Sequence, residues 1–334
     1  MLVIAIDVMS GDHGPHECVA GALRAVDADE GLYALLVGKP ADIEPELGRV
    51  SQRLRARFEI APASQVVAMD ELPRAAVRRG RDSSMRVAVN LVKEGRAAAC
   101  VSAGNTGALT AISHFVLKTV ANVERAAIVS AIPSAHGHTQ MLDLGANTRA
   151  TPRQLCQFAA MGIVVARDLH GVASPRVGLL NIGEEDIKGH ELVREAHEML
   201  ARGNLTYVGF VEGDGIFSGV VDVVVTDGFT GNVALKTMEG LARLIAERTR
   251  NEFRASVRAR LAGLVASPVL RRLAAGLDPR RYNGACMVGL SGIVVKSHGH
   301  ADATAFARAV EVAARAARGG LTTRITQAIE AQGS

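Results

Sequence analysis

Three polar, glycine-containing segments could bind an anion. Each follows a short apolar run and leads into a helix pattern: residues 10–15 (SGDHGP), 102–108 (SAGNTGA) and 226–232 (TDGFTGN). Backbone N–H groups at a helix start carry partial positive charge and suit phosphate. Loops at the carboxyl ends of parallel strands can converge on one crevice, so we expect a shared site. Its candidate phosphate- or substrate-binding residues are Asp12, His13, Gly104, Asn105, Thr106, Asp227, Asn232 and, further along the third helix, Lys236.

Two further segments carry reactive side chains. Residues 292–302 (GIVVKSHGHAD) place Lys296, His298 and Asp302 after an apolar strand and into the next helix. A lysine there can hold an anion, and a histidine can move a proton near neutral pH. Residues 142–147 (LDLGAN) end another apolar strand on a turn that contains Asn147. A lysine and a histidine at one strand end are as often structural as catalytic, so the pattern alone leaves both open.

Several other kinds of chemistry lack their signatures. The pairs His136/His138 and His298/His300 have no carboxylate or cysteine at zinc spacing, so we expect no metal. The four cysteines form no CxxC pair, which fits small buried side chains in a reducing cytosol. The sequence has no GxGxxG turn between a strand and a helix, no Walker A lysine and no GxSxG elbow. No cofactor is therefore expected.

Short apolar strands must position these loops. Runs rich in Val, Ile and Leu alternate with helix-patterned segments such as 83–93, 106–117, 152–168 and 185–201. The predicted strands are 2–6, 33–37, 97–101, 126–131, 176–181, 205–211 and 220–226. Near-continuous apolar strands are buried on both faces, as in a parallel sheet covered by helices. We therefore predict one α/β domain over residues 1–334, with three α/β/α layers and a largely parallel sheet.

The net charge of the whole chain is a weak indication of its partners. The 334 residues carry 38 Lys and Arg against 34 Asp and Glu, a net charge of +4. An excess of basic residues suggests binding to nucleic acid. However, aromatic residues make up only 3% of the chain, and the recognition of RNA and single strands uses aromatic stacking. We expect no nucleic-acid partner. The N-terminus lacks a basic region, and no apolar run approaches the length of a membrane span, which predicts a soluble or membrane-attached protein.

Residues 250–281 hold most of the basic charge. This helix-patterned segment has eight arginines and two acidic residues, which leaves about −2 for the rest of the chain. Aliphatic residues fall among the arginines, and Pro268 near the middle predicts a protruding hairpin of two helical runs. A basic amphipathic helix suits an anionic membrane surface. A dimerisation arm and an ordinary helix pair with a solvated basic face remain alternatives.

Eight blocks in one order carry a resemblance. They are GDHGP (11–15), DSSMRVA (82–88), SAGNTGA (102–108), LGAN (144–147), QFAAMG (157–162), NIGEE (181–185), VVTDGFTGNVALK (224–236) and VVKSHGHADA (294–303). Together they resemble the bacterial phosphate acyltransferases, also called acyl-acyl-carrier-protein:phosphate acyltransferases, over residues 3–330. Departures from the family pattern are Ser10, residues 212–215, residues 284–289 and Ser291.

The resemblance implies a fold and a reaction. The fold is that of the isopropylmalate dehydrogenase and phosphotransacetylase group. The implied enzyme is a cytoplasmic homodimer attached peripherally to the membrane. It converts acyl-acyl-carrier-protein and inorganic phosphate to acyl phosphate and free carrier protein. A membrane glycerol-3-phosphate acyltransferase would use the acyl phosphate in phospholipid synthesis.

The residues and the resemblance together suggest a mechanism. Lys236 and Lys296 would hold phosphate, which attacks the thioester carbonyl directly. Asn105, Asn147 and Asn232 are candidate donors to the oxyanion. His298, oriented by Asp302, would protonate the leaving thiol. The alternatives are a phosphotransacetylase-like transfer from acyl-coenzyme A and a non-catalytic membrane scaffold for lipid enzymes.

Overall fold

The computed structural model describes residues 1–48 and 50–332. Its strands join in one sheet. In this part of the chain the order is β3-β2-β1-β4-β11-β10-β5-β6-β9-β7-β8. The strands are β1 (Leu2–Asp7), β2 (Leu32–Gly38), β3 (Phe58–Pro62), β4 (Ala99–Ser102), β5 (Ala127–Ser134), β6 (Gly137–Leu142), β7 (Val177–Leu180), β8 (Tyr207–Val211), β9 (Val223–Val225), β10 (Ala285–Val288) and β11 (Ile293–Lys296).

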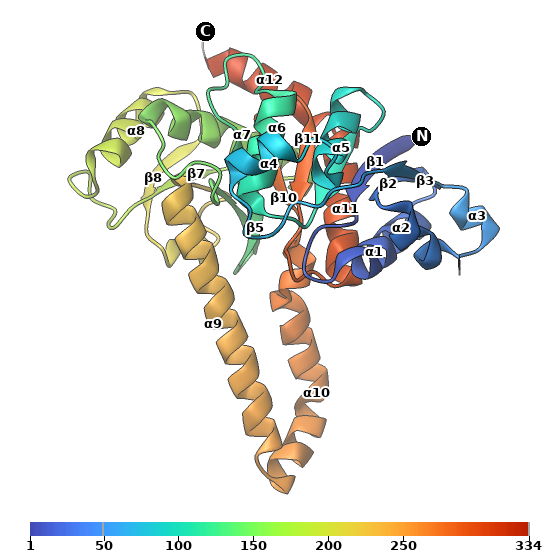
Figure 1. Cartoon of the computed structure of the whole chain (residues 1–334). Helices are drawn as coiled ribbons and strands as arrows, with labels where there is room; N and C mark the ends of the chain where they lie inside the picture. The colour runs from blue at the N-terminus through green and yellow to red at the C-terminus, as the bar shows by residue number, and fades with distance from the viewer. Residues whose placement is uncertain (49, 333–334) are drawn as a thin grey trace.

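Helices cover both faces of this sheet (Figure 1). They are α1 (Gly14–Ala28), α2 (Pro40–Leu47), α3 (Gln52–Arg55), α4 (Pro73–Arg79), α5 (Ser84–Lys93), α6 (Thr106–Leu117), α7 (Pro152–His170), α8 (Glu191–Arg202), α9 (Gly228–Arg254), α10 (Val257–Leu277), α11 (Ala303–Arg318) and α12 (Leu321–Gln332), with 3₁₀ turns at Gly215–Phe217 and Pro279–Tyr282. One buried apolar cluster lies under α1, α7, α11 and α12, and a second under α5 and α6. The predicted α/β class is confirmed.

The sheet reverses its direction in the middle. β1, β4 and β11 are parallel, as are β6, β9, β7 and β8. Three antiparallel pairs separate these groups: β11 with β10, β10 with β5, and β5 with β6. An odd number of reversals makes the two groups run in opposite directions. The carboxyl ends of β6 and β9 therefore point to the opposite edge of the sheet from those of β1, β4 and β11, so the predicted loops do not all leave the sheet at one edge.

Helices α9 and α10 form an arm that projects from the body (Figure 1). The turn between them is at Ala255 and Ser256, where the Ser256 hydroxyl accepts a hydrogen bond from Ala259 N and begins α10. Pro268 lies inside α10, so the expected break at this proline is wrong. The arm is also longer than residues 250–281, because α9 begins at Gly228. The side chains of Arg271, Leu273 and Arg281 lie outside the described part.

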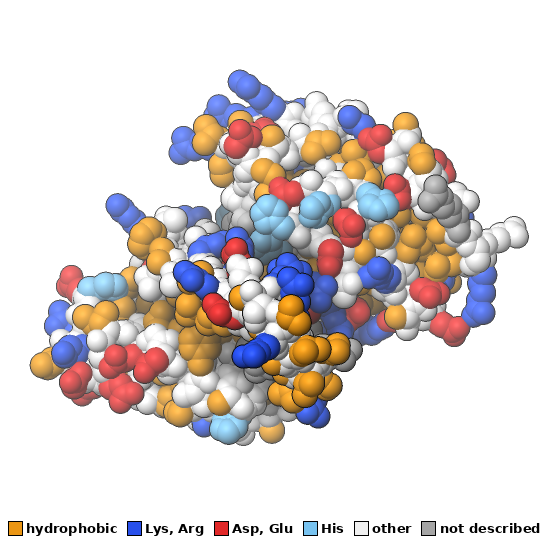
Figure 2. Space-filling view, turned by 90° about the horizontal axis from the view of Figure 1, so that it is seen from below, with side chains coloured by type: hydrophobic (Ala, Val, Ile, Leu, Met, Phe, Trp, Pro, Cys, Tyr) orange, Lys and Arg blue, Asp and Glu red, His pale blue; other side chains and the backbone are white. Residues whose placement is uncertain are grey.

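Large hydrophobic side chains remain exposed on the arm. Leu264 is 72% exposed and Val265 is 82% exposed. Seen from below, with the arm directed at the viewer, basic and hydrophobic side chains gather in the middle of the face (Figure 2). Within the described residues, no helix is long and apolar enough to cross a membrane.

Candidate functional site

Three loops meet at the carboxyl ends of β1, β4 and β11. Asp12 N donates a hydrogen bond of 2.9 Å to the carbonyl oxygen of Gly299. Gly11 has a φ of +92°, and a Cβ at this position would lie 2.9 Å from the Cβ of Ala103. Only glycine fits this close approach without strain. The neighbouring parallel strands thus bring the loops after residues 7, 102 and 296 together.

The buried carboxylate of Asp7 ties two of these loops. Its Oδ2 accepts hydrogen bonds from Ser10 Oγ at 2.5 Å and Ser102 Oγ at 2.7 Å. Burial raises the pKa of Asp7 although these hydrogen bonds oppose the shift. Ser10, a departure from the family pattern, therefore has a defined structural partner.

Lys296 ends β11 beneath these loops. Its Nζ donates to the carbonyl oxygens of Ala103, at 3.3 Å, and Ser297. Burial and repulsion from Lys236 lower the pKa of Lys296 to about 8, against the opposing effect of Asp12 and Asp7. Lys236, from a distant segment of the chain, therefore lies near enough to repel Lys296, which itself contacts only carbonyl oxygens among the described residues.

A second group of loops is organised by Asp143. Its Oδ1 accepts from Ile128 N at 2.9 Å and Ala146 N at 3.0 Å, and its Oδ2 accepts from Asn147 N at 2.7 Å. Burial raises the pKa of Asp143, and these hydrogen bonds oppose the shift. The carboxylate fixes the turn that carries Asn147.

The first turn of α9 packs directly on this turn. A Cβ at Gly231 would lie only 1.9 Å from the carbonyl oxygen of Asp143. We expect Gly231→Ala to lower the free energy of unfolding by about 3 kcal/mol, the upper part of the range for overpacking, because a backbone atom must move. Urea unfolding followed by circular dichroism measures this.

Gly240, in the same helix, provides the matched control. Apart from the neighbouring backbone of its own helix, no atom of the described residues lies within 4 Å of a Cβ at this position. Gly240→Ala should therefore raise stability by about 0.5–1 kcal/mol through helix propensity. Equal effects of the two substitutions would contradict the proposed contact.

One face of α9 connects the two groups of loops. Asn232, Lys236 and Glu239 are spaced by four and three residues, which places them on one stripe of the helix. Gly145 lies beside Asn232, since a Cβ at Gly145 would be 3.5 Å from Asn232 Oδ1. The stripe therefore runs from the turn at Asp143 toward Lys296.

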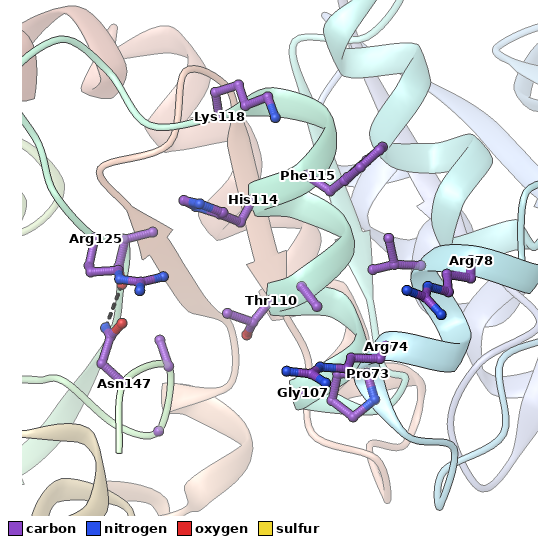
Figure 3. A pocket seen from close by; sticks show the side chains of 15 residues that line it. Pro73, Arg74, Arg78, Gly107, Thr110, His114, Phe115, Lys118, Arg125 and Asn147 are labelled. Atoms are coloured by element: carbon purple, nitrogen blue, oxygen red, sulfur yellow. Dashed lines mark hydrogen bonds between the residues drawn. The ribbon is translucent and has the colours of Figure 1, made fainter. Parts of the chain in front are cut away.

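An open cleft of about 650 Å³ lies over the outward face of α6. Helix α4 forms one wall, and residues 125–126 with 145–147 form the other (Figure 3). Gly107, in the first turn of α6, lies at one end of the row of α6 residues in the cleft. The cleft therefore adjoins both the 102–106 loop and the turn at Asn147.

His298 has a carboxylate partner that the sequence analysis missed. Its Nε2 lies 3.6 Å from Glu239 Oε2, and Lys236 Nζ lies 2.8 Å from the same oxygen. Burial would raise the pKa of Glu239, but hydrogen bonds from His298 and Lys236 lower it to about 2. Glu239 stands three residues after Lys236 in an ordinary helix pattern, so no motif marked it.

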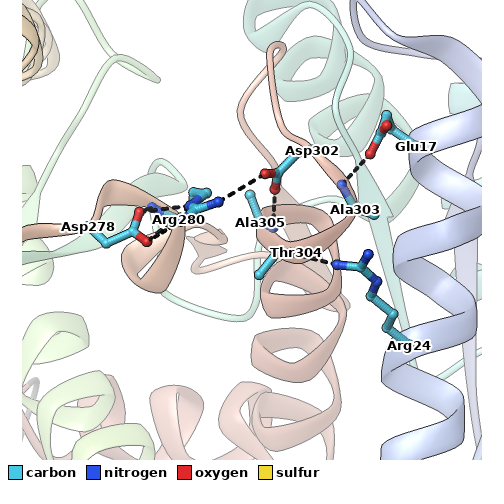
Figure 4. Close-up of polar contacts among 8 residues, drawn as sticks. All are labelled: Glu17, Arg24, Asp278, Arg280, Asp302, Ala303, Thr304 and Ala305. Atoms are coloured by element: carbon cyan, nitrogen blue, oxygen red, sulfur yellow. Dashed lines mark hydrogen bonds and ion pairs between the residues drawn. The ribbon is translucent and has the colours of Figure 1, made fainter. Parts of the chain in front are cut away.

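Asp302 does not orient His298, contrary to expectation. Its Oδ1 accepts from Ala305 N at 2.8 Å, which caps α11, and its Oδ2 lies 3.3 Å from Arg280 Nη1 (Figure 4). Asn283 instead fixes the His298 backbone, because its Oδ1 accepts from His298 N at 2.8 Å. The local sequence favoured Asp302 because an aspartate four residues after a histidine is visible, whereas Glu239 is distant in the chain.

Two of the three candidate oxyanion donors are already occupied. Asn105 Nδ2 donates to the carbonyl oxygens of Met69 and Glu71 at 2.7 and 3.1 Å. Asn147 Nδ2 donates to Ala126 O at 2.7 Å and Asp143 Oδ2 at 3.0 Å. Both amides therefore shape loops. Among the described residues, the Asn232 side chain has no hydrogen-bond partner, so its amide remains available.

The other predicted residues have different structural surroundings. Asp227 caps α9, because its Oδ1 accepts from Phe229 N and Thr230 N at 2.9 and 3.0 Å. Asp12 Oδ2 pairs with His300 Nδ1 at 2.5 Å, whereas His13 is exposed at the start of α1. Gly104 packs against Met85 and Ser10. Thr106 begins α6 beside Asn105, and within the described structure no acceptor meets its N–H group.

Sequence relatives place the chain in a family. A family model described as "Fatty acid synthesis protein" matches residues 2–324. The phosphate acyltransferase of Alkalilimnicola ehrlichii is 53% identical over 329 residues, which cover 98% of this chain and 96% of the relative. That of Methylococcus capsulatus is 51% identical over 325 residues, 97% of this chain and 96% of the relative. The chain belongs to the phosphate acyltransferase family.

Solved structures support the fold expected of a phosphate acyltransferase. A phosphotransacetylase from Streptococcus pyogenes has a TM-score of 0.62 at 17% identity, covering 95% of this chain and 94% of that one. A branched-chain phosphotransacylase from Enterococcus faecalis has a TM-score of 0.58 at 13% identity, covering 95% and 99%. The family identifies the chain as an acyltransferase of fatty acid and lipid synthesis.

Proposed function

We propose that this phosphate acyltransferase transfers an acyl group from acyl-acyl-carrier-protein to inorganic phosphate. The observation that carries the proposal is the convergence of Lys236 and Lys296 beside His298. Lys236 is already paired with Glu239, whereas the Lys296 ammonium meets carbonyl oxygens and, within the described residues, no carboxylate, so a bound anion would supply its ion-pair partner. The N–H of Thr106 begins α6, directly after the loop whose Ala103 carbonyl Lys296 contacts, and adds a donor at a helix start.

The reaction balances without a covalent enzyme intermediate. An oxygen of HPO₄²⁻ attacks the thioester carbonyl carbon, a C–O bond forms, and the C–S bond breaks. The products are acyl phosphate and the free thiol, so the proton of HPO₄²⁻ ends on sulfur. His298 can carry that proton, with Glu239 holding the imidazole beside Lys236. Asn232 is the candidate donor to the oxyanion.

Thiol release tests the proposal. Purified protein is incubated with long-chain acyl-carrier-protein, with and without phosphate, and free thiol is measured. Phosphate-dependent release supports the proposal. Release from acyl-coenzyme A but not from the carrier substrate would favour the phosphotransacetylase-like reaction. Absence of phosphate-dependent release from both would favour the scaffold.

The pKa of Lys296 predicts a pH dependence. Lys296 is charged below about pH 8 and loses its charge as the pH rises, whereas an ordinary lysine does so near 10.5. Above this pH, the charged fraction of Lys296 falls about tenfold per pH unit. We expect kcat/KM for phosphate, which reports the free enzyme, to fall by the same factor. In Lys296→Arg the fall should vanish, since arginine stays charged. A fall of the same size in both proteins would contradict the assignment.

The arm is proposed to contact an anionic membrane surface. Arg254, Arg258 and Arg260 are exposed near the turn, together with Leu264 and Val265. Basic and apolar side chains on one projecting element suit binding to anionic lipid. This would leave the enzyme in the cytoplasm at the inner face of the membrane. A membrane glycerol-3-phosphate acyltransferase would then take the reactive acyl phosphate.

Vesicle sedimentation tests this contact. We expect the double variant Leu264→Asp/Val265→Asp to bind anionic vesicles at least tenfold more weakly, because burial of each apolar side chain contributes about 1.5–3 kcal/mol. The control Ile187→Asp/Val220→Asp alters two exposed apolar residues of the body and should bind like the parent. Unchanged binding by the arm variant would instead favour an oligomer arm.

A homodimer is also proposed. Val233, Leu241 and Leu244 are exposed on α9 at roughly helical spacing. An unpaired apolar stripe on a long helix is typical of a surface covered by a second copy. Sedimentation equilibrium of Leu241→Glu/Leu244→Glu measures whether the stripe holds two chains together.

A further inference from the structure

The charged side chains that line the cleft over α6 are all basic. Arg74, Arg78, Lys118 and Arg125 line it, and none of its fifteen lining residues is acidic. Within the described structure, no carboxylate forms an ion pair with any of these four side chains. Burial, together with repulsion from Arg125 and Lys118, lowers the pKa of His114 in the same cleft. The cleft is therefore a basic surface whose charge is not neutralised from within the chain.

An exposed aromatic ring lies within this basic surface. Phe115 is 52% exposed in a chain where aromatic residues make up only 3%. Arg86 Cζ lies 4.9 Å and Lys118 Nζ 5.2 Å from the centre of its ring. Cation–π contacts hold these long side chains in place before any partner arrives. Exposed aromatics flanked by arginine are typical of protein interfaces.

The cleft leads toward the proposed reaction site. Its residues along α6 run from Gly107 to Lys118, the residue that follows the helix, a rise of about 16 Å at 1.5 Å per residue. Gly107 is next to Thr106, and the opposite wall at Asn147 adjoins the first turn of α9. Small or apolar residues, among them Val77, Ala111 and Ala146, also line the cleft between its basic side chains. Such a cleft suits a linear arm that carries an acyl group inward.

We propose that this cleft docks the acyl carrier protein. Its acidic surface would contact the basic side chains, and its anionic prosthetic arm would lie along α6 with the thioester toward Gly107. The inference rests on the proposed function. A second copy of the chain fits less well, because this face would meet itself with cations opposed to cations. A lipid surface also fits less well, since the cleft is concave and lies on the body, away from the tip of the arm (Figure 1).

Charge reversal tests the docking surface. The variant is Arg78→Glu/Arg125→Glu, and the control is Arg167→Glu/Arg194→Glu, which changes net charge equally on exposed positions of α7 and α8. The readout is the ratio of kcat/KM for acyl-carrier-protein to kcat/KM for acyl-pantetheine. We expect this ratio to fall at least tenfold in the variant and to stay within twofold of the parent in the control. Anisotropy of labelled carrier protein should show a matching loss of affinity.

The outcomes separate the two proposals. A parent enzyme without phosphate-dependent turnover would overturn the proposed function. A working parent whose ratio and carrier affinity are unchanged in the variant would overturn the docking surface alone. Loss of vesicle binding, or dissociation into monomers, with an unchanged ratio would likewise overturn it and assign the cleft to lipid or to a second copy.

Discussion

Lys296→Ala should lower kcat/KM for phosphate by about 10²–10³-fold, the cost of removing one preorganised donor to developing charge. Lys296 is the partly enclosed cation of the site, and Lys236 lies close enough to lower its pKa. Its loss leaves phosphate with one lysine that is already paired to Glu239. Steady-state kinetics with varied phosphate measures the change.

Lys93→Ala is the matched control. Lys93 is exposed in the last turn of α5, and its removal should change kcat/KM by less than twofold. Circular dichroism establishes that both variants fold. Unchanged turnover of Lys296→Ala and His298→Ala at saturating phosphate would place the reaction elsewhere.

His298→Ala should lower kcat by about 10²–10⁴-fold, the usual contribution of general acid–base catalysis. The imidazole is the group placed to move a proton between phosphate and sulfur, with Nε2 3.6 Å from Glu239. KM for the thioester should change little, because the imidazole is expected to act in the transition state rather than in substrate binding. Single-turnover measurements separate this step from product release.

Glu239→Gln tests the positioning role of the missed carboxylate. We expect about a tenfold fall in kcat with a small change in KM. Loss of the negative charge also leaves Lys236 unneutralised, which strengthens its repulsion of Lys296. The alkaline limb of kcat/KM for phosphate should therefore move to lower pH. A variant with lower kcat but an unmoved limb would show that Glu239 acts only as a structural residue.

The sequence predicted the local features well. Apolar runs such as 2–6 and 293–296 became buried strands, because burial on both faces demands continuous hydrophobic residues. The polar loops after them became helix starts, since Asn105 and Asp227 are good N-caps. The same capping preference explains why two predicted ligands have structural roles. In the sequence, a residue that caps a helix start has the same type and position as one that binds an anion there.

The sequence by itself determined the family, the α/β class and the basic character of residues 250–281, and it predicted a functional role for the Lys296–His298 segment. Only the tertiary structure decided how these parts meet. Three antiparallel pairs reverse the sheet, so the loop after β9 is connected to the site by the first turns of α9, up to Glu239, rather than by a shared edge. Glu239 becomes the partner of His298, and Asp302 turns to cap α11. Local patterns report contacts within a few residues, whereas strand order and helix length set contacts between residues far apart in the chain.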